Sequence, residues 1–233
     1  MADKIQTLIF SGANNHAWKL STPLVWLLLG RSGRFDATVT VSPSDALEDE
    51  SLVNRTDLFF SDYNGPDWSE VAKANLERAI EAGKGLVILH AADNSFEGWV
   101  AYEKMAALLW RKGTGHGAFH EFPVTIVDRK HPITKGLPDF RITDELYHKL
   151  VHMHDAEHHV LATGHSSTES GGTGQEEPVM LTTQYGEGRV FHMVLGHIWE
   201  SDTPDFTALD NAHFRRALLR GCEWAATGKV TLP

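Results

Sequence analysis

Histidine and carboxylate side chains follow the predicted strands of this chain, at positions where an α/β protein builds its active site. His90, Asp93 and Asn94 come directly after Leu86 to Leu89 (LVIL), an apolar run with no polar interruption. Such a run is typical of a strand buried on both faces of a parallel sheet, and ligands bind at the carboxyl ends of such strands. The pattern indicates chemistry here. A buried structural histidine followed by a helix cap is the alternative interpretation.

Other short motifs carry the same residue types where predicted strands give way to loops. They are Asn14-Asn15-His16, Gly115 to His120 (GHGAFH), Asp144 to His148 (DELYH) and Gly196-His197. Imidazole is the commonest metal ligand, and it exchanges protons near neutral pH. Convergence of such groups from distant segments would therefore build a metal or acid-base site.

The spacing inside two of these motifs allows more than one interpretation. His116 and His120 lie four residues apart, but the flanking glycines favour a glycine-rich loop at the site, or an exposed turn, over a helix. Glu145 and His148 lie three residues apart, so a short helical turn would let both reach one ion or one substrate. The alternative is a surface helix capped by Asp144.

The segments that must position these motifs alternate between strand and helix in the first half of the chain. The predicted strands are Thr7–Phe10, Ala37–Val41, Asp57–Asp62 and Gly85–His90, followed by Pro123–Val127, His159–Ala162, Val179–Gln184 and Arg189–Leu195. The predicted helices are Ser21–Leu29, Trp68–Ala82, Ser95–Trp110 and Asn211–Thr227. Alternation of this kind predicts a three-layer α/β/α sandwich with a mostly parallel sheet and a strand-rich C-terminal half. We expect one domain over residues 1–233.

Composition excludes several classes of protein. The 42% hydrophobic and 22% charged content is that of a globular protein, and no apolar run reaches the roughly 18 residues that a membrane span needs. A net charge of −10 without a basic run argues against nucleic acid. The N-terminus enters a strand too early for a signal peptide, so we expect a cytoplasmic protein. A homodimer is the expectation from base rates alone.

Motifs of other enzyme classes are missing from the sequence. The single cysteine, Cys222, lies in a predicted helix, where a packed core residue is expected, and it excludes a disulfide framework or a cysteine metal cluster. No phosphate-binding G-x-x-x-x-G-K-[ST] loop or G-x-S-x-G elbow occurs. We therefore expect no nucleotide cofactor and no acyl-enzyme chemistry.

Taken in order, the motifs resemble those of the ThuA-like family, named for trehalose utilisation, over nearly the whole chain. The residues that carry the resemblance are Asn15-His16, Gly85 to Asn94, His131 to Thr134, Asp144 to His148, Glu177 to Val179, Tyr185 to Phe191 and Leu195 to His197. The resemblance implies a flavodoxin-like fold of the class I glutamine amidotransferase type. It also implies a role in the catabolism of trehalose or other disaccharides as 3-keto derivatives.

One departure from amidotransferases bears on the chemistry. In those enzymes the strand that corresponds to Gly85–Leu89 leads to a cysteine, and here it leads to His90. Without a thiolate the glutaminase reaction has no attacking group, so the resemblance does not carry that activity to this chain.

Our first hypothesis is a metal-assisted enzyme that hydrolyses, eliminates or isomerises a carbohydrate, with a divalent ion such as zinc or manganese. The residues predicted to do chemistry are His90, Asp93 and Glu145. Those predicted to bind substrate are Asn15, His16, Asn94 and Tyr147. Those predicted to hold the metal are His116, His120, His148 and His197. The alternatives are a non-catalytic sugar-binding or regulatory module and a metal-independent hydrolase with Asp93 and Glu145 as paired carboxylates.

Overall fold

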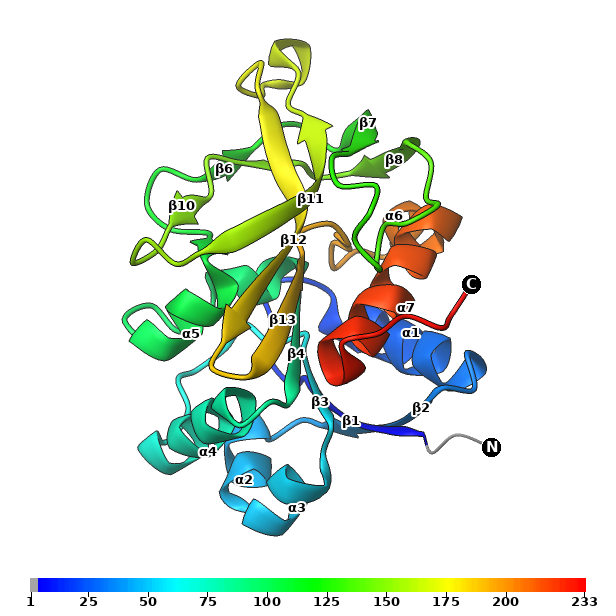
Figure 1. The fold of residues 1–233 in the computed structure, drawn as a ribbon. Coiled ribbons are helices and arrows are strands. Elements are labelled where there is room, and N and C mark those ends of the chain that lie inside the picture. Colours follow the sequence, from blue (N-terminus) through cyan, green and yellow to red (C-terminus); the bar gives the residue numbers. More distant parts are fainter. Residues whose placement is uncertain (1–3) are drawn as a thin grey trace.

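The structure, a computed structural model that describes residues 4–233, is built on a nine-stranded sheet of order β2-β1-β3-β4-β13-β12-β11-β7-β8 (Figure 1). Its strands are β1 (Ile5–Phe10), β2 (Phe35–Thr40), β3 (Leu58–Ser61), β4 (Gly85–Leu89), β7 (His120–Ile126), β8 (Phe140–Asp144), β11 (His158–His165), β12 (Glu176–Tyr185) and β13 (Gly188–Met193). Residues 1–3 lie outside the described part. They belong to the N-terminal segment in which no signal peptide is expected.

The sheet is mixed. Strands β2, β1, β3, β4 and β13 pair in parallel, and β13, β12, β11, β7 and β8 pair in antiparallel fashion. Two small ladders join β5 (Leu108–Leu109) to β10 (Val151–His152) and β6 (Gly115–His116) to β9 (Tyr147–His148). The predicted α/β fold with a strand-rich C-terminal half is confirmed, but the sheet is evenly mixed rather than mostly parallel, because the strands after β13 in the sheet order pair in antiparallel fashion.

Helices cover both faces of the sheet. They are α1 (Trp18–Arg31), α2 (Pro43–Glu48), α3 (Glu50–Arg55), α4 (Glu70–Glu81), α5 (Val100–Ala106), α6 (Thr207–Asp210) and α7 (Ala212–Thr227). Figure 1 shows α1 and α7 on one side of β4 and β13, and α4 and α5 on the other. Within residues 4–233 no helix has the length and apolarity to cross a bilayer.

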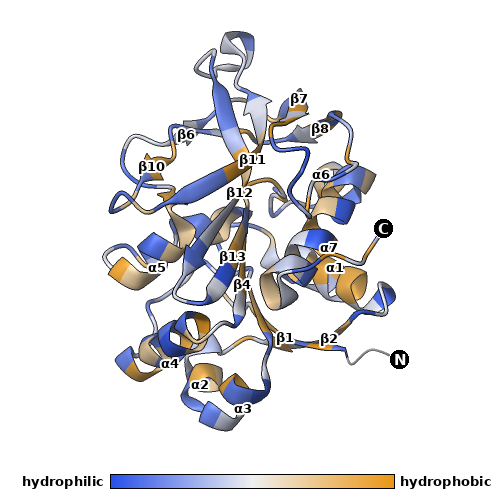
Figure 2. Ribbon diagram, in the orientation of Figure 1, coloured by the Kyte–Doolittle hydropathy of each residue, from blue (hydrophilic) through white to orange (hydrophobic). Residues whose placement is uncertain are grey.

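Alternating side chains of the central strands supply two separate cores. Val87 and Leu89 pack in one core with α1 and α7, and Leu86 and Ile88 pack in the other with α4 and α5. All four are buried, which explains why β4 reads as a continuous apolar run. The surface helix α4 instead carries strongly hydrophobic and strongly hydrophilic residues next to one another (Figure 2), since only one of its faces meets the sheet.

Two predicted helix boundaries differ from the structure. Helix α1 begins at Trp18, three residues before the predicted start at Ser21; Ser21 and Thr22 are buried, and their hydroxyls donate to the carboxylate of Asp62. Helix α5 covers only Val100–Ala106 of the predicted range. The backbone takes positive φ angles at Phe96, Gly98 and Ala107, which interrupts the helix on both sides.

The helical turn predicted for Glu145 to His148 is wrong. Asp144 ends β8, and Tyr147 and His148 form β9, which pairs with β6. The spacing of Glu145 and His148 would suit a helix, but the pairing of β9 with β6 holds this segment in an extended conformation. Because neighbouring side chains of a strand point to opposite faces, Tyr147 and His148 are directed away from each other.

Candidate functional site

The candidate site lies at the carboxyl ends of the parallel strands. His16 lies on the loop after β1, His90 begins the 3₁₀ helix η1 (His90–Asn94) directly after β4, and His197 follows β13. Since these strands run in the same direction, their following loops lie at one edge of the sheet. His90 has a positive φ of 43°, an uncommon backbone conformation for a residue other than glycine, and it marks a sharp elbow at the strand end.

The three histidines form one compact group. His16, His90 and His197 each offer a ligand atom, and these atoms lie within 4.8 Å of one another. The ring centroids are 4.6 to 5.1 Å apart, with interplanar angles of 79 to 89°. His90 and His197 are buried and His16 is half-buried. Within residues 4–233 this is the group whose geometry fits a metal ion.

The environment keeps all three imidazoles neutral. Burial lowers the pKa of His16 to about 4 and that of His197 to about 3, and repulsion from neighbouring histidines lowers both further in the same direction. The pKa of His90 falls well below its usual value, again mainly because of burial. Neutral imidazole is the form that binds a metal, so the group is in its ligand form near neutral pH.

Hydrogen bonds fix which nitrogen of His90 and of His16 can accept an ion. His90 Nδ1 lies 2.7 Å from the carbonyl oxygen of Val194, and because a carbonyl only accepts, Nδ1 carries the proton. The lone pair of His90 is therefore on Nε2. His16 Nδ1 lies 3.0 Å from Asn15 Oδ1, which likewise leaves Nε2 of His16 as the acceptor. Metal-binding histidines commonly donate their second N–H to a carbonyl in this way.

The donor set fits a divalent ion. The ligand atoms of the three histidines lie within 4.8 Å of one another, and two nitrogens at about 2.0–2.1 Å from one tetrahedral zinc would lie about 3.3 Å apart, so small side-chain movements would bring them into place. His197 Nε2 is buried and has no hydrogen-bond partner among the described residues. An arrangement of three protein ligands with an open side is that of catalytic rather than structural zinc sites.

Glu145 supplies a carboxylate next to this group. Its Oε2 lies 3.2 Å from His197 Nδ1, and its Oε1 accepts a hydrogen bond from the indole of Trp199 at 3.1 Å. His116 Nδ1 lies 3.5 Å from the same Oε1, at the exposed side. Burial raises the pKa of Glu145, which brings it toward the range that suits a general base at neutral pH.

Asp144 holds the loop that carries His197, a role that the sequence motifs did not indicate. Its carboxylate accepts hydrogen bonds from the backbone N–H groups of Gly196 at 2.7 Å and His197 at 3.1 Å. Gly196 has a φ of +123°, a conformation that favours glycine. Burial raises the pKa of Asp144 to about 7 despite these hydrogen bonds. The nearest signal in the sequence was its place directly before Glu145.

A cavity of about 140 Å³ opens beside the histidines. It is lined by Asn15, His16, Ala91, Asp93, Asn94, Trp110, His116, Glu145, Tyr147 and Trp199. The Trp199 ring also stacks on His16, with centroids 5.3 Å apart. The lining combines indole faces with amide, carboxyl and imidazole groups, the chemistry that recognises a polar ring such as a sugar.

Asp93 lines this cavity but has an unusual environment. Both of its carboxyl oxygens are buried without a hydrogen-bond partner among the described residues, and Oδ2 lies 3.8 Å from His192 Nε2. Burial raises its pKa well above the usual value, and the positive charge of Arg111 lowers it only in part. The balance of these two effects favours the protonated form of Asp93. His192, which is fully buried, was not among the predicted site residues.

Seven of the eleven predicted site residues line this cavity, His90 and His197 lie beside it in the histidine group, and His120 and His148 belong to neither. His120 begins β7, where its Nδ1 donates to the carbonyl of Ala118 at 2.7 Å. His148 points away from the cavity, and its Nδ1 lies 3.4 Å from Ser166 Oγ. Of the four histidines predicted as ligands, only His197 belongs to the compact group. His16 and His90, predicted for other roles, complete it.

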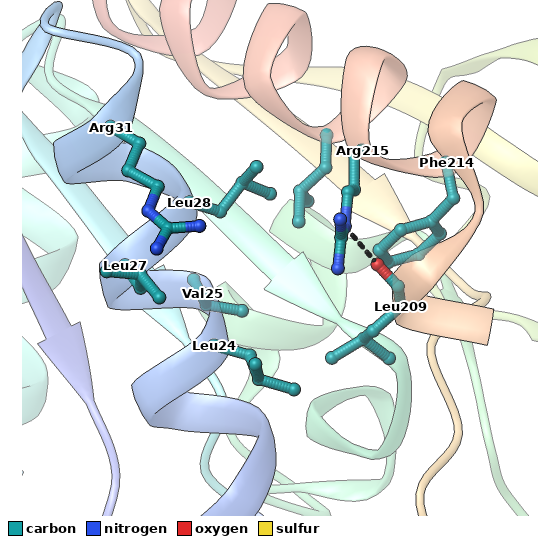
Figure 3. Close-up of a pocket in the computed structure, with 9 residues that line it drawn as sticks. Leu24, Val25, Leu27, Leu28, Arg31, Leu209, Phe214 and Arg215 are labelled. Carbon is teal, nitrogen blue, oxygen red and sulfur yellow. Dashed lines mark hydrogen bonds between the residues drawn. The ribbon is translucent and has the colours of Figure 1, made fainter. Parts of the chain in front are cut away.

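A second hollow, of about 110 Å³, lies between α1 and α7 (Figure 3). Leucines and Val25 line it together with Arg31 and Arg215, and Arg215 Nε donates to the carbonyl of Leu209 at 2.6 Å. No histidine or carboxylate belongs to its lining. It therefore lacks the groups that acid-base or metal chemistry needs.

Comparison with known proteins gives the family. The sequence matches the ThuA family, described as trehalose utilisation, over residues 6–225. The chain belongs to the ThuA family. A ThuA-like protein of known structure from Parabacteroides merdae is 35% identical, with a TM-score of 0.90, and the match covers 99% of this chain and 93% of the other. No curated protein sequence matches the chain.

More distant structures share the ThuA fold alone. A ThuA-like protein from Bacteroides uniformis is 16% identical with a TM-score of 0.72, and the match covers 99% of this chain and 95% of the other. A cold-adapted β-galactosidase from Rahnella is 17% identical with a TM-score of 0.57, and the match covers 93% of this chain but only 31% of that enzyme. The ThuA fold thus also occurs as one part of larger proteins.

Proposed function

We propose that this ThuA protein is a metal-assisted enzyme that acts on a carbohydrate, in the form of a keto derivative of trehalose or a related disaccharide. The observation that carries the proposal is the group of three neutral imidazoles, His16, His90 and His197, whose ligand atoms lie within 4.8 Å of one another beside a polar cavity. A divalent ion bound there would polarise a carbonyl or hydroxyl oxygen and stabilise an adjacent enolate.

The side chains around the ion would then divide the proton transfers. Glu145 takes a proton from the carbon next to the keto group, because it lines the cavity and burial raises its pKa. The Trp199 N–H on Glu145 Oε1 directs the other oxygen toward the histidines. His116 lies at the exposed side of Glu145, with its Nδ1 3.5 Å from Glu145 Oε1 and donating to the carbonyl of Gly117 at 2.7 Å, so this N–H can help to orient the carboxylate. Abstraction of such a proton leads to elimination or isomerisation.

The substrate class follows from the lining and the family. Trp110 and Trp199 offer faces on which a sugar ring can stack, and Asn15 and Asn94 offer amides to its hydroxyls. The ThuA family description, trehalose utilisation, supports a disaccharide source. The net charge of −10 favours neutral sugars over sugar phosphates. We propose no nucleic-acid, membrane or nucleotide ligand.

The cellular setting belongs to the same proposal. Two proteins from Salmonella typhimurium with the same fold, at 13% and 14% identity, are described as cytoplasmic. We place this chain in the cytoplasm as well, as a homodimer.

The proposal is tested on the purified full chain without a histidine tag. Elemental analysis should find close to one equivalent of a divalent metal per chain, and a chelator should abolish turnover of 3-keto-trehalose until zinc or manganese is restored. Full turnover by metal-free protein would refute the proposal. Calorimetric binding of the sugar without turnover, unchanged by chelator, would instead support the alternative of a non-catalytic sugar-binding module.

A further inference from the structure

The hydroxyl of Tyr147 makes a hydrogen bond to the ring nitrogen of His90 that a bound ion would need. Tyr147 is 3% exposed, and its ring stacks on His90 with centroids 4.4 Å apart. Within residues 4–233 the hydrogen-bond partner of its hydroxyl is His90 Nε2, at 2.9 Å. The edge of Trp110 holds the other side of the ring at 4.7 Å, so the phenol has little freedom to move away as a whole.

The direction of this hydrogen bond follows from the other side of the imidazole. His90 Nδ1 carries a proton, because it donates to the carbonyl of Val194. The neutral ring then has a single lone pair, on Nε2, so Tyr147 must donate to it; His197 Nδ1 lies 3.0 Å from the same nitrogen. Burial and the nearby carboxyl groups of Asp93 and Glu145 raise the pKa of Tyr147, which keeps the hydroxyl protonated.

An ion coordinated by His90 uses that same lone pair. The Tyr147 hydroxyl and the ion are therefore mutually exclusive partners of Nε2. When the ion binds, the hydroxyl must turn to a new acceptor, and the ring already lines the cavity beside Glu145 and Trp199. A substrate oxygen in the cavity is the acceptor within reach.

We propose that Tyr147 couples the two binding events: it holds the His90 lone pair while the metal position is empty, and metal binding releases its hydroxyl to donate to an oxygen of the sugar. This inference rests on the proposed function, since it needs both the ion and the carbohydrate. Binding linkage then requires that metal and sugar raise each other's affinity by the same factor. Tyr147 is thereby a substrate-binding residue only in the metal-loaded protein.

The test compares wild type, Tyr147→Phe and Tyr102→Phe by zinc calorimetry. Because Tyr147→Phe removes the hydroxyl, the nearer of the two groups within hydrogen-bond distance of His90 Nε2, we expect it to bind zinc about 2- to 12-fold more tightly, the range given by one hydrogen bond. Tyr102 is a matched control: it is a buried tyrosine whose hydroxyl donates to the carbonyl of Ala92, and we expect its zinc affinity to equal that of wild type. Equal or weaker zinc binding by Tyr147→Phe overturns the inference.

Two further measurements distinguish a failure of the proposed function from a failure of the role of Tyr147. In the wild type, zinc should shift the near-ultraviolet difference spectrum of tyrosine, because one buried hydroxyl exchanges its acceptor; this reading needs no variant to fold. Zinc should also strengthen binding of 3-keto-trehalose to the wild type, and Tyr147→Phe should lose most of that gain. A wild type that binds no zinc refutes the proposed function. A wild type that binds zinc with no tyrosine shift and no gain in sugar affinity overturns the role of Tyr147 alone.

Discussion

The histidines of the parallel half of the sheet differ from those of the antiparallel half in what surrounds them. His16, His90 and His197 follow parallel strands and present their ligand atoms within 4.8 Å of one another. His159 and His165 lie on the antiparallel strand β11, and each pairs with one nearby surface carboxylate, at 2.8 and 3.0 Å. All five residues are histidines, but of these only His16, His90 and His197 come close enough to bind one ion.

Strand direction explains the difference. Parallel strands all end at the same edge of a sheet, so the residues that follow β1, β4 and β13 meet there. Antiparallel neighbours end at opposite edges, and the side chains within a strand alternate between its faces. A histidine in that half therefore finds only local partners. The comparison teaches that strand direction, more than the number of histidines, assembles a shared site.

Removal of one histidine from each half gives the largest expected contrast. His90→Ala takes away one of the three proposed ligands, so zinc affinity should fall by roughly 100-fold or more, beyond what loss of an outer-shell partner costs. His165→Ala removes an exposed histidine and should change zinc affinity by at most about twofold. Calorimetry on both variants checks this. Equal effects would erase the distinction between the two halves.

A second pair of variants compares carboxylates in the same two environments. Glu145→Gln keeps the shape of the side chain but removes the base, so the turnover rate should fall by roughly 100- to 10,000-fold while zinc stays bound. Glu176→Gln, on the antiparallel strand β12, should behave as wild type. Steady-state kinetics with zinc analysis on both proteins measures this. Retained turnover in Glu145→Gln would remove Glu145 from the chemistry.

His192 sharpens the comparison, because it lies in the parallel half but outside the group of three. Burial lowers its pKa from 6.5 to about 4, so the unfolded chain binds a proton in this interval that the folded protein does not. Its stabilising contribution is complete above pH 6.5 and is lost as pH falls toward 4. Between pH 7 and 5 this loss amounts to about 2 kcal/mol of unfolding free energy.

The corresponding measurement is urea unfolding of wild type, His192→Gln and His165→Gln at pH 7 and pH 5. His192→Gln should lose about 2 kcal/mol less than wild type between the two pH values. The buried acids Asp62 and Asp144, whose pKa values are raised to about 6 and about 7, favour low pH, but they are common to all three proteins and cancel in the difference. Identical pH profiles would show that His192 does not titrate in this range.

The amino-acid sequence by itself indicated eight of the nine strands of the large sheet and the family, but not β8 or the short helices α2 and α3. The apolar run before His90 predicted β4, the glycine at position 83 predicted the end of α4, and the order of short motifs indicated the ThuA family. These signals succeed because each depends on local periodicity or on a conformation that glycine favours. The clustering of polar residues at strand ends also indicated the carboxyl ends of the parallel strands, where the histidine group lies.

Only the tertiary structure decided which side chains meet. The spacing of Glu145 and His148 suggested a shared helical face, but pairing of β9 with β6 turned His148 away. His16 joined the histidine group from a loop 74 positions before His90, and Asp144 held the loop of His197 by backbone hydrogen bonds. Contacts of this kind depend on strand direction and register over long separations, and no local pattern in the chain encodes them.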